Sequence, residues 1–175
     1  MASEIKKRRS HDLRQVTQWR WYLDEVFVKI NGEIHYLWRG IDDHGEVMEL
    51  YVTQSRHKAS ALKFLKKAMK HDGKLQQVVT DKLRSYRAAM NVIGNASRQI
   101  TDRYENNLCK NSDLPFRRRE RAMARFRQMR SLQKFASAHA TFHNHFNHDR
   151  SLERRSRFKD LRHAALTEWR ELLVV

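Results

Sequence analysis

Residues 19–53 read WRWYLDEVFVKINGEIHYLWRGIDDHGEVMELYVT, and the pattern of this stretch decides the fold. Its segments 19–30, 34–41 and 47–53 are rich in aromatic and β-branched residues, which predicts three β-strands. Asn31 and Gly32 separate the first two segments, and this pair favours a tight hairpin because both positions tolerate a positive φ. A second turn is predicted at 42–45. We therefore expect an antiparallel meander of three strands.

Downstream of this meander the hydrophobic period changes from two to about 3.6 residues. Segments 57–71 and 84–92 predict helices, segments 75–80 and 96–101 predict short strands, and the remainder is helical. Three antiparallel strands followed by helix-linked strands suit an α/β fold, a ribonuclease-H-like mixed five-stranded sheet flanked by helices, although other α+β domains share this order of elements. We assign residues 1–17 to a basic N-terminal arm and residues 18–175 to this domain, which includes a helical C-terminal part.

The composition is that of one globular domain. The chain has 175 residues, 40% of them hydrophobic, which is enough for a single compact core. No apolar run approaches the roughly 20 residues of a membrane helix, and no apolar stretch follows the N-terminal charges as in a secretory signal. The single cysteine, Cys109, has no partner for an internal disulfide, which fits a reducing cytosol. We expect a cytoplasmic protein without a membrane partner.

The charge balance indicates a polyanionic partner. The chain carries 36 Lys and Arg against 20 Asp and Glu, a formal net charge of +16. The excess is divided evenly between residues 1–100 and 101–175, so it belongs to the folded body rather than to a detachable tail. Such a surface attracts nucleic acid first and anionic membranes second. The alternative is a basic protein without a nucleic-acid partner.

Two acids stand out by their places in the predicted strands. Asp24 lies inside an apolar strand, where a buried carboxylate is costly without a partner. Asp81 ends the short strand QQVVTD (76–81), at the edge where α/β sheets place ligands. On adjacent strands, these carboxylates could hold a divalent metal ion through hard oxygen ligands. The structural alternatives are a hydrogen-bonded acid at Asp24 and a helix N-cap at Asp81.

The segment 116–130 is rich in arginine. Arg117, Arg121 and Arg125 are four residues apart and would line one helix face, while Met123, Phe126 and Met129 would pack inward. Arginine suits phosphate because its planar fork donates two parallel hydrogen bonds. A solvated helix face is the alternative. The candidate DNA contacts are Lys82, Arg84, Arg117, Arg118, Arg119, Arg121 and Arg125.

Histidines gather in one predicted helix. His139 and His143 are four residues apart and lie on its apolar stripe. A zinc site would need a further acid, histidine or cysteine at suitable spacing. We interpret both residues as core or surface histidines.

Several longer motifs occur in a fixed order: residues 19–47 and 78–90 (VVTDKLRSYRAAM), the pair Arg98-Gln99, the pair Asn106-Asn107, and 111–147 (NSDLPFRRRERAMARFRQMRSLQKFASAHATFHNHFN). Together they resemble the catalytic domain of IS-six-type bacterial insertion-sequence transposases of the DDE class, over roughly residues 5–172. The resemblance implies a ribonuclease-H-like, integrase-like core whose two Mg²⁺ (or Mn²⁺) ions activate water or a 3′-hydroxyl to attack DNA phosphodiesters. Asp24 and Asp81 match the first and second catalytic, metal-binding acids of that family. The resemblance also implies terminal inverted repeats and target DNA as partners, a homo-oligomer on DNA, and a place at the bacterial nucleoid.

The third acid of the family is replaced. In the family a glutamate follows two asparagines and two variable residues, whereas here the stretch 106–111 reads NNLCKN and Lys110 occupies the glutamate position. An ammonium in place of a carboxylate weakens the binding of a divalent cation. Glu105 and Asp113 are the nearby acids that could substitute. We expect that this chain does not cleave or transfer DNA strands at a useful rate.

A second departure is at the amino end. Family members carry a helix-turn-helix region before the catalytic domain, and residues 1–17 have no room for two helices. We therefore interpret the chain as a truncated, degenerate copy or an excised domain. Two alternatives to a DNA transposase catalytic domain stay open. One is a non-catalytic DNA-binding remnant, and the other is an inhibitor that assembles with intact transposase.

Overall fold

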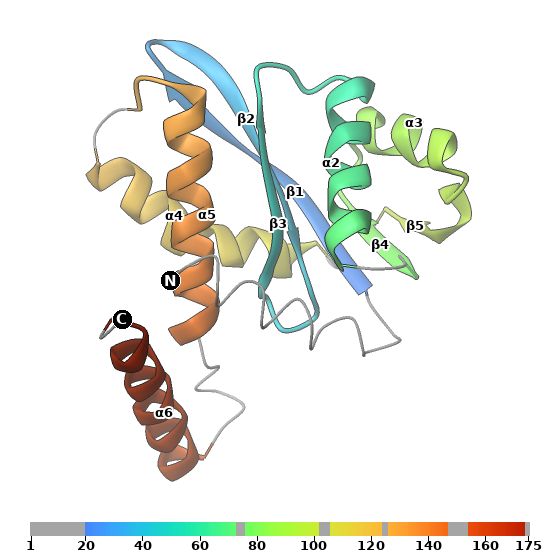
Figure 1. Ribbon diagram of the computed structural model, residues 1–175. Coiled ribbons are helices and arrows are strands. Elements are labelled where there is room, and N and C mark those ends of the chain that lie inside the picture. Colours follow the sequence, from blue (N-terminus) through green and yellow to red (C-terminus); the bar gives the residue numbers. More distant parts are fainter. Residues whose placement is uncertain (1–19, 73–75, 102–105, 124–125, 147–153, 174–175) are drawn as a thin grey trace.

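A computed structural model describes residues 20–72, 76–101, 106–123, 126–146 and 154–173, so the predicted arm 1–17 lies outside the described residues. The strands are β1 (Arg20–Ile30), β2 (Glu33–Ile41), β3 (Val47–Thr53), β4 (Gln77–Thr80) and β5 (Gln99–Ile100). They form one sheet in the order β3-β2-β1-β4-β5 (Figure 1). The first three strands are antiparallel, and β4 runs parallel to both β1 and β5. This confirms the predicted mixed sheet of the ribonuclease-H-like fold.

The hairpin between β1 and β2 forms at the predicted pair. Asn31 has a φ of 52° and Gly32 a φ of 89°, the left-handed values that a two-residue hairpin turn requires. From this turn the ladder runs without a shift from Ile30 opposite Glu33 to Tyr22 opposite Ile41. The turn therefore fixes which residues of β2 stand beside Asp24 and Glu25.

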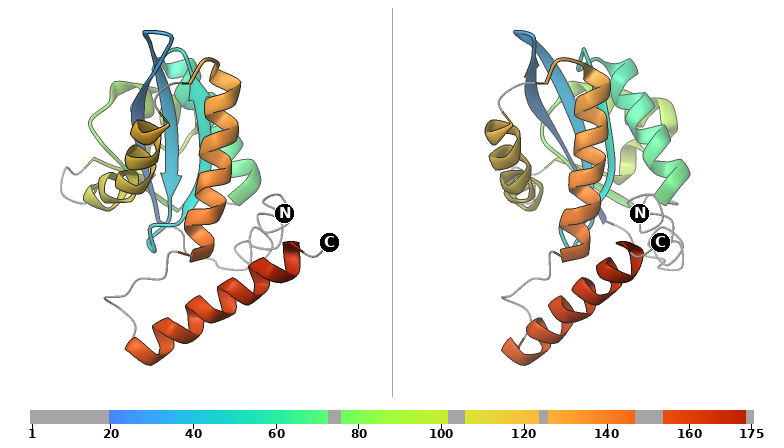
Figure 2. Two further views of the ribbon diagram at one scale, coloured as in Figure 1. Left: turned by 90° about the vertical axis from the view of Figure 1, so that its left-hand side faces the viewer. Right: turned by 60° about the vertical axis from the view of Figure 1, so that its left-hand side comes forward.

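Helices cover both faces of the sheet. α2 (Lys58–Asp72) and α3 (Arg84–Ile93) lie on one face, while α4 (Asn107–Ala122) and α5 (Met129–Phe146) lie on the other (Figures 1 and 2). α6 (Arg155–Leu173) packs on the C-terminal end of α5, where Nε2 of His145 lies 2.8 Å from the carbonyl oxygen of Ala165. Figure 2 shows α6 away from the sheet, beyond the end of α5.

Alternation along β1 sends successive side chains into two separate cores. Trp21 and Leu23 pack with the α2 and α3 side chains, whereas Val26 and Val28 pack with those of α4 and α5. A carboxylate at position 24 therefore belongs to the α4 face of the sheet, and one at position 25 belongs to the α2 and α3 face.

Two short predicted strands differ in extent. The predicted strand 75–80 begins at Gln77, and Leu75 lies outside the described residues. The predicted strand 96–101 is only the pair Gln99–Ile100, preceded by a 3₁₀ turn at Ala96–Arg98. β5 pairs with β4 through Gln99 and Ile100, and the side chains of the preceding turn are exposed.

The prediction of one helix face through residues 116–130 is wrong. α4 ends at Ala122 and α5 begins at Met129, because Phe126 forms a parallel bridge with Ile30 and Asn31 Nδ2 donates to the Arg127 carbonyl at 2.9 Å. Phe126 is buried as predicted, but Met123 and Met129 are 53% and 39% exposed. Phe126 and Arg127 therefore pair with the end of β1 instead of continuing the helix.

Candidate active site

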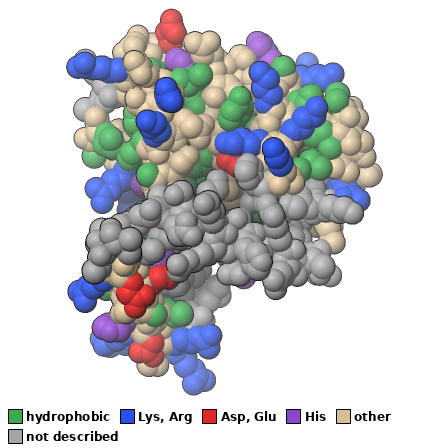
Figure 3. All heavy atoms as spheres, in the orientation of Figure 1, with side chains coloured by type: hydrophobic (Ala, Val, Ile, Leu, Met, Phe, Trp, Pro, Cys, Tyr) green, Lys and Arg blue, Asp and Glu red, His purple; other side chains and the backbone are tan. Residues whose placement is uncertain are grey.

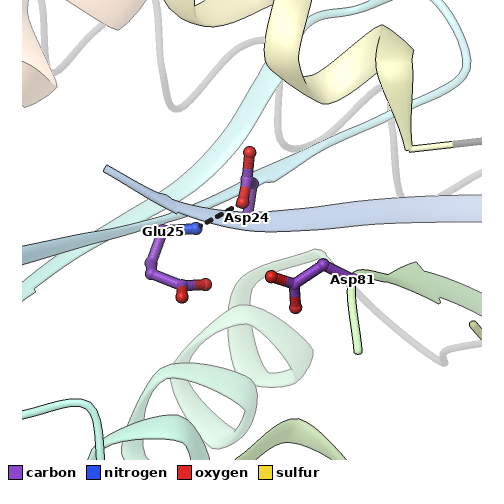
Figure 4. Close-up of side chains that lie close together, drawn as sticks. All are labelled: Asp24, Glu25 and Asp81. Carbon is purple, nitrogen blue, oxygen red and sulfur yellow. Dashed lines mark hydrogen bonds between the residues drawn. The ribbon is translucent and has the colours of Figure 1, made fainter. Parts of the chain in front are cut away.

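Asp24 sits near the middle of β1, beside Arg39 of β2 in the antiparallel ladder. Its side chain is partly buried and points toward α4 (Figure 4). Oδ1 of Asp24 accepts a hydrogen bond from the Glu25 backbone N–H at 3.0 Å. One oxygen therefore turns back along the strand toward Glu25.

Asp81 follows the last residue of β4, which runs parallel to β1 with Thr80 opposite Leu23. This register brings Asp81 out of its strand beside Asp24, as the sequence predicts. Oδ1 of Asp81 accepts from the Leu83 backbone N–H at 2.9 Å, just before α3 begins at Arg84. The local turn into α3 therefore uses one carboxylate oxygen, and the second oxygen is free of this turn.

Three carboxylates converge at this point. Oxygens of Asp24, Glu25 and Asp81 all lie within 4.8 Å of one another, and Figure 4 shows Glu25 and Asp81 pointing toward each other. Within the described part of the chain, no other group of three or more His, Cys, Asp or Glu side chains comes together in this way. Carboxylate oxygens at this spacing are suitable ligands for a hard divalent cation.

Sequence reasoning missed Glu25. Strand alternation assigns Glu25 to the face opposite Asp24, and this assignment is correct. The two acids nevertheless share a site, because Asp81 extends beyond the end of its strand, within reach of both. The available signal was the unusual pair of adjacent acids inside an apolar strand.

Burial and repulsion between the carboxylates raise the pKa values of Asp24 and Glu25. The pKa of Asp24 is raised to about 6, chiefly by burial, with a contribution from the Asp81 carboxylate and opposed by Lys110 and Arg39. The pKa of Glu25 is raised to about 8, chiefly by burial, together with the charges of Asp81 and Asp24. Asp24 and Glu25 therefore resist full ionisation at neutral pH, and a bound cation would favour their charged forms.

Lys110 lies beside this cluster. The first turn of α4 is anchored on β1, where Asn106 Nδ2 donates to the Leu23 carbonyl at 3.2 Å and Cys109 Sγ donates to the Tyr22 carbonyl at 3.6 Å. The next residue, Lys110, is exposed, and its ammonium lowers the pKa of Asp24. The position predicted for the third acid therefore lies within electrostatic range of Asp24 and carries a positive charge instead of a negative one.

Of the two possible substitutes for the third acid, Asp113 is among the described residues. Asp113 forms an ion pair with Arg39 of β2, whose side chain is 3% exposed. Nη2 of Arg39 also donates to the carbonyl and the hydroxyl oxygens of Ser112, at 3.2 and 3.0 Å. Asp113 is therefore engaged with a buried guanidinium, a role that the sequence did not suggest. Glu105 lies outside the described residues.

The candidate DNA-contacting residues fall into two groups. Lys82, Arg84, Arg118, Arg119 and Arg121 are exposed. Arg117 instead donates from Nη1 to the Phe27 carbonyl and lies 3.8 Å from Glu120, so its guanidinium binds the protein itself. Arg125 lies outside the described residues. In Figure 3 the Lys and Arg side chains are distributed over the visible face rather than gathered in one patch.

None of the helices in the described residues has the length and apolar character needed to cross a bilayer.

Comparison with known proteins gives consistent results. A family model described as a DDE domain, of the IS240 transposase type, matches residues 18–149. The transposase of the insertion sequence-like element IS431mec from Staphylococcus aureus (strain Mu50) is 35% identical over 95 residues, which cover 51% of this chain and 42% of the relative. The transposase of IS257 in transposon Tn4003 from S. aureus matches with the same identity and coverage. Each match therefore spans less than half of the relative's own length.

Among solved structures, the HTLV-2 integrase catalytic core domain in complex with magnesium (trimeric form) aligns with a TM-score of 0.48 and 14% identity. That alignment covers 57% of this chain and 66% of the integrase chain.

Proposed function

Because this chain belongs to the DDE-domain family of insertion-sequence transposases, we propose that it acts on DNA through metal-dependent cleavage and transfer of phosphodiester strands. The observation that supports this reaction is the approach of Asp24 and Asp81, whose oxygens lie within 4.8 Å of each other on neighbouring parallel strands. In this proposal Asp24 and Asp81 are the acids that hold the catalytic cation.

The residues present fit a hard divalent cation. The converging donors are carboxylate oxygens, which Mg²⁺ and Mn²⁺ prefer to nitrogen or sulfur ligands. A bound Mg²⁺ or Mn²⁺ supplies Lewis acidity toward the scissile phosphate. Asp24 is held in β1 and Asp81 by its turn into α3, so the protein fixes both ligands before any DNA arrives.

Lys110 makes the proposed activity weak. Two unit charges about 4 Å apart interact by roughly 4 kcal/mol at an effective dielectric near 20, and by twice that against a divalent ion. Lys110 is exposed, so solvent screening and rotation of its side chain reduce this penalty. The interaction of Lys110 with a bound cation is nevertheless unfavourable, because the charge that acts on Asp24 from α4 is positive. We therefore assign this chain a low rate of strand cleavage.

A second candidate function is DNA binding without catalysis. Two observations favour it: Lys110 at the position of the third acid, and the net charge of +16. A basic surface is sufficient for DNA binding, which does not require three metal-binding acids. Such a domain would occupy DNA, or assemble with intact transposase and inhibit it. Cleavage that depends on the metal and on Asp81 distinguishes the enzyme from this remnant.

The proposed partners follow from the transposase relatives. We propose terminal inverted repeats and target DNA as the substrates, a homo-oligomer on that DNA, and the bacterial cytoplasm beside the nucleoid as the location. The support is that the matched relatives are transposases of a bacterium, S. aureus. The exposed positions Lys82, Arg84, Arg118, Arg119 and Arg121 are the proposed phosphate contacts.

Nicking of a supercoiled plasmid in Mg²⁺ or Mn²⁺ tests the function. The parent chain is expected to nick slowly, and Lys110→Glu is expected to nick faster because a carboxylate returns beside Asp24. The matched control is the double variant Lys110→Glu with Asp81→Ala, which is expected to lose the gain. Equal nicking by the single and double variants, or no nicking by Lys110→Glu, would contradict the proposed reaction and leave DNA binding as the function.

A further inference from the structure

The carboxylate of Glu25 is buried, but the described residues around it do not supply enough hydrogen bonds or charge to offset the cost of its burial. Its side chain is 4% exposed, and Oε2 accepts no hydrogen bond from any of the described residues. A buried carboxylate without a partner is strongly destabilising, so such groups are rare unless they bind something. Glu25 points to Asp81 rather than into the apolar core, as Figure 4 shows.

The nearest cation does not neutralise Glu25 well. Nη1 of Arg56 lies 3.9 Å from Glu25 Oε1, and the Arg56 side chain is 48% exposed. The Arg56 guanidinium also lies over the rings of Phe27 and Tyr36, 5.6 and 5.9 Å from their centroids. This long, solvent-exposed contact reaches the oxygen Oε1 and leaves the buried Oε2 without a hydrogen-bond donor among the described residues.

Glu25 and Lys110 act on the cluster from opposite faces of the sheet. The Lys110 ammonium acts on Asp24 from α4, whereas Glu25 stands on the α2 and α3 face with Arg56 as its opposing charge. The Glu25 carboxylate therefore lies on the face of the sheet away from Lys110, and the replacement of the family's third acid by Lys110 leaves this carboxylate in place.

We propose that Glu25 is a third carboxylate ligand, which together with Asp24 and Asp81 binds one divalent cation where the three side chains converge. This inference rests on the proposed function for the identity of the cation, and it assigns to Glu25 a role outside the three-acid motif of the family. It also separates two properties of the chain: cation binding is retained, while Lys110 slows the reaction.

Calorimetric titration with Mn²⁺ alone, without DNA, tests the inference on the parent chain and on Glu25→Gln. We expect one site in the parent and an affinity at least about tenfold lower in Glu25→Gln, since even indirect partners of metal ligands are worth roughly 10–100-fold. The matched control is Glu49→Gln, which changes another buried glutamate, on β3 beside Lys67, and is expected to leave the affinity unchanged.

Thermal unfolding gives a second readout that a purely structural role of Glu25 would not move in the same way. Without metal, Glu25→Gln is expected to raise the Tm at neutral pH, because Gln carries no carboxyl group that must take up a proton on folding. With Mn²⁺, the same variant is expected to show a smaller Tm increase than the parent. If Glu25→Gln does not fold, Glu25→Asp withdraws the carboxylate by one methylene group, and its affinity replaces that of Glu25→Gln in the comparison.

The inference is overturned if the parent binds no Mn²⁺, if removing or withdrawing the Glu25 carboxylate leaves the affinity unchanged, or if Glu49→Gln weakens binding equally. These outcomes are distinct from failure of the proposed function. If only the proposed function fails, the parent and its Glu25 variants still differ in Mn²⁺ affinity as described, but Lys110→Glu does not nick DNA.

Discussion

Arg39 and Asp113 form an ion pair between β2 and α4, with side-chain exposures of 3% and 13%. Arg39 also stands beside Asp24 in the ladder, so the same guanidinium that holds α4 on the sheet contributes positive charge at the cluster. Asp113 is thereby bound to the scaffold and is not a third metal ligand in this account.

Removing one partner of this pair is expected to destabilise the fold. Asp113→Asn leaves the Arg39 guanidinium buried without its counter-charge, which costs about 3–5 kcal/mol in comparable buried pairs. The double variant Arg39→Met with Asp113→Leu is expected to recover most of the loss, because no charge stays buried. Urea unfolding of the single and double variants measures both values. Equal stability of Asp113→Asn and the parent would contradict this role.

The charge at position 110 is expected to set the pKa of Asp24. Burial raises that pKa to about 6, and the Lys110 ammonium lowers it. Lys110→Met removes the lowering influence, so the Asp24 carboxyl should titrate at a higher pH in metal-free buffer, and Lys110→Glu should raise it further. Carbon-detected NMR of the side-chain carboxyl groups follows the titration. An unchanged Asp24 pKa in both variants would show that Lys110 does not face the cluster.

His139 is expected to make stability fall in acid. Its pKa is lowered to about 4, chiefly by burial, together with the charges of His143, Arg39 and Arg119. The unfolded chain binds the proton near pH 6.5, so the folded state loses stability as the pH falls from about 6.5 to about 4. At pH 5 the loss is about 1 kcal/mol after allowance for the partly solvent-facing ring, or roughly 2–4 °C in Tm.

His139→Phe isolates this effect, because it keeps a ring against Phe116 and Phe135 and removes the titrating group. The change in Tm from pH 7 to pH 5 is expected to be roughly 2–4 °C more positive in the variant than in the parent. Equal pH dependence in the two proteins would assign the acid sensitivity to other groups.

The exposed arginines of α4 are expected to set the salt dependence of DNA binding. Replacing Arg118, Arg119 and Arg121 together by Ala should reduce the slope of log affinity against log salt by up to about three phosphate contacts. Fluorescence anisotropy with a random duplex at several salt concentrations measures this slope. Arg117→Ala serves as the comparison and should lower stability rather than the slope, because Arg117 donates to the Phe27 carbonyl. A triple variant with an unchanged slope would show that this helix face is merely solvated.

The positions of Asp24 and Asp81 could be predicted from the sequence because they depend on short local patterns. Asn31 and Gly32 set the hairpin, and alternating apolar residues in β1 and β2 set the register that places Asp24. A short strand that ends in an acid was sufficient to place Asp81 beside it. Each of these features depends on a few consecutive residues.

Other features depend on contacts between distant segments, which no local pattern contains. Glu25 joins the cluster because Asp81 extends past the end of its strand, and Arg39 finds its polar partners, Ser112 and Asp113, on α4. The helical period of residues 116–130 continues through a segment that is not helical, because Phe126 bridges to Ile30 at the end of β1. Tertiary pairing overrides local helical preference at this point.

The central claim is that Asp24 and Asp81, with Glu25, form a divalent cation site in a domain that carries Lys110. Anomalous diffraction from crystals of the parent chain grown with Mn²⁺ tests it most directly. The account predicts one anomalous peak at roughly 2–2.5 Å from oxygens of all three carboxylates. A peak bound by other residues, or no peak at these carboxylates at saturating Mn²⁺, would contradict it.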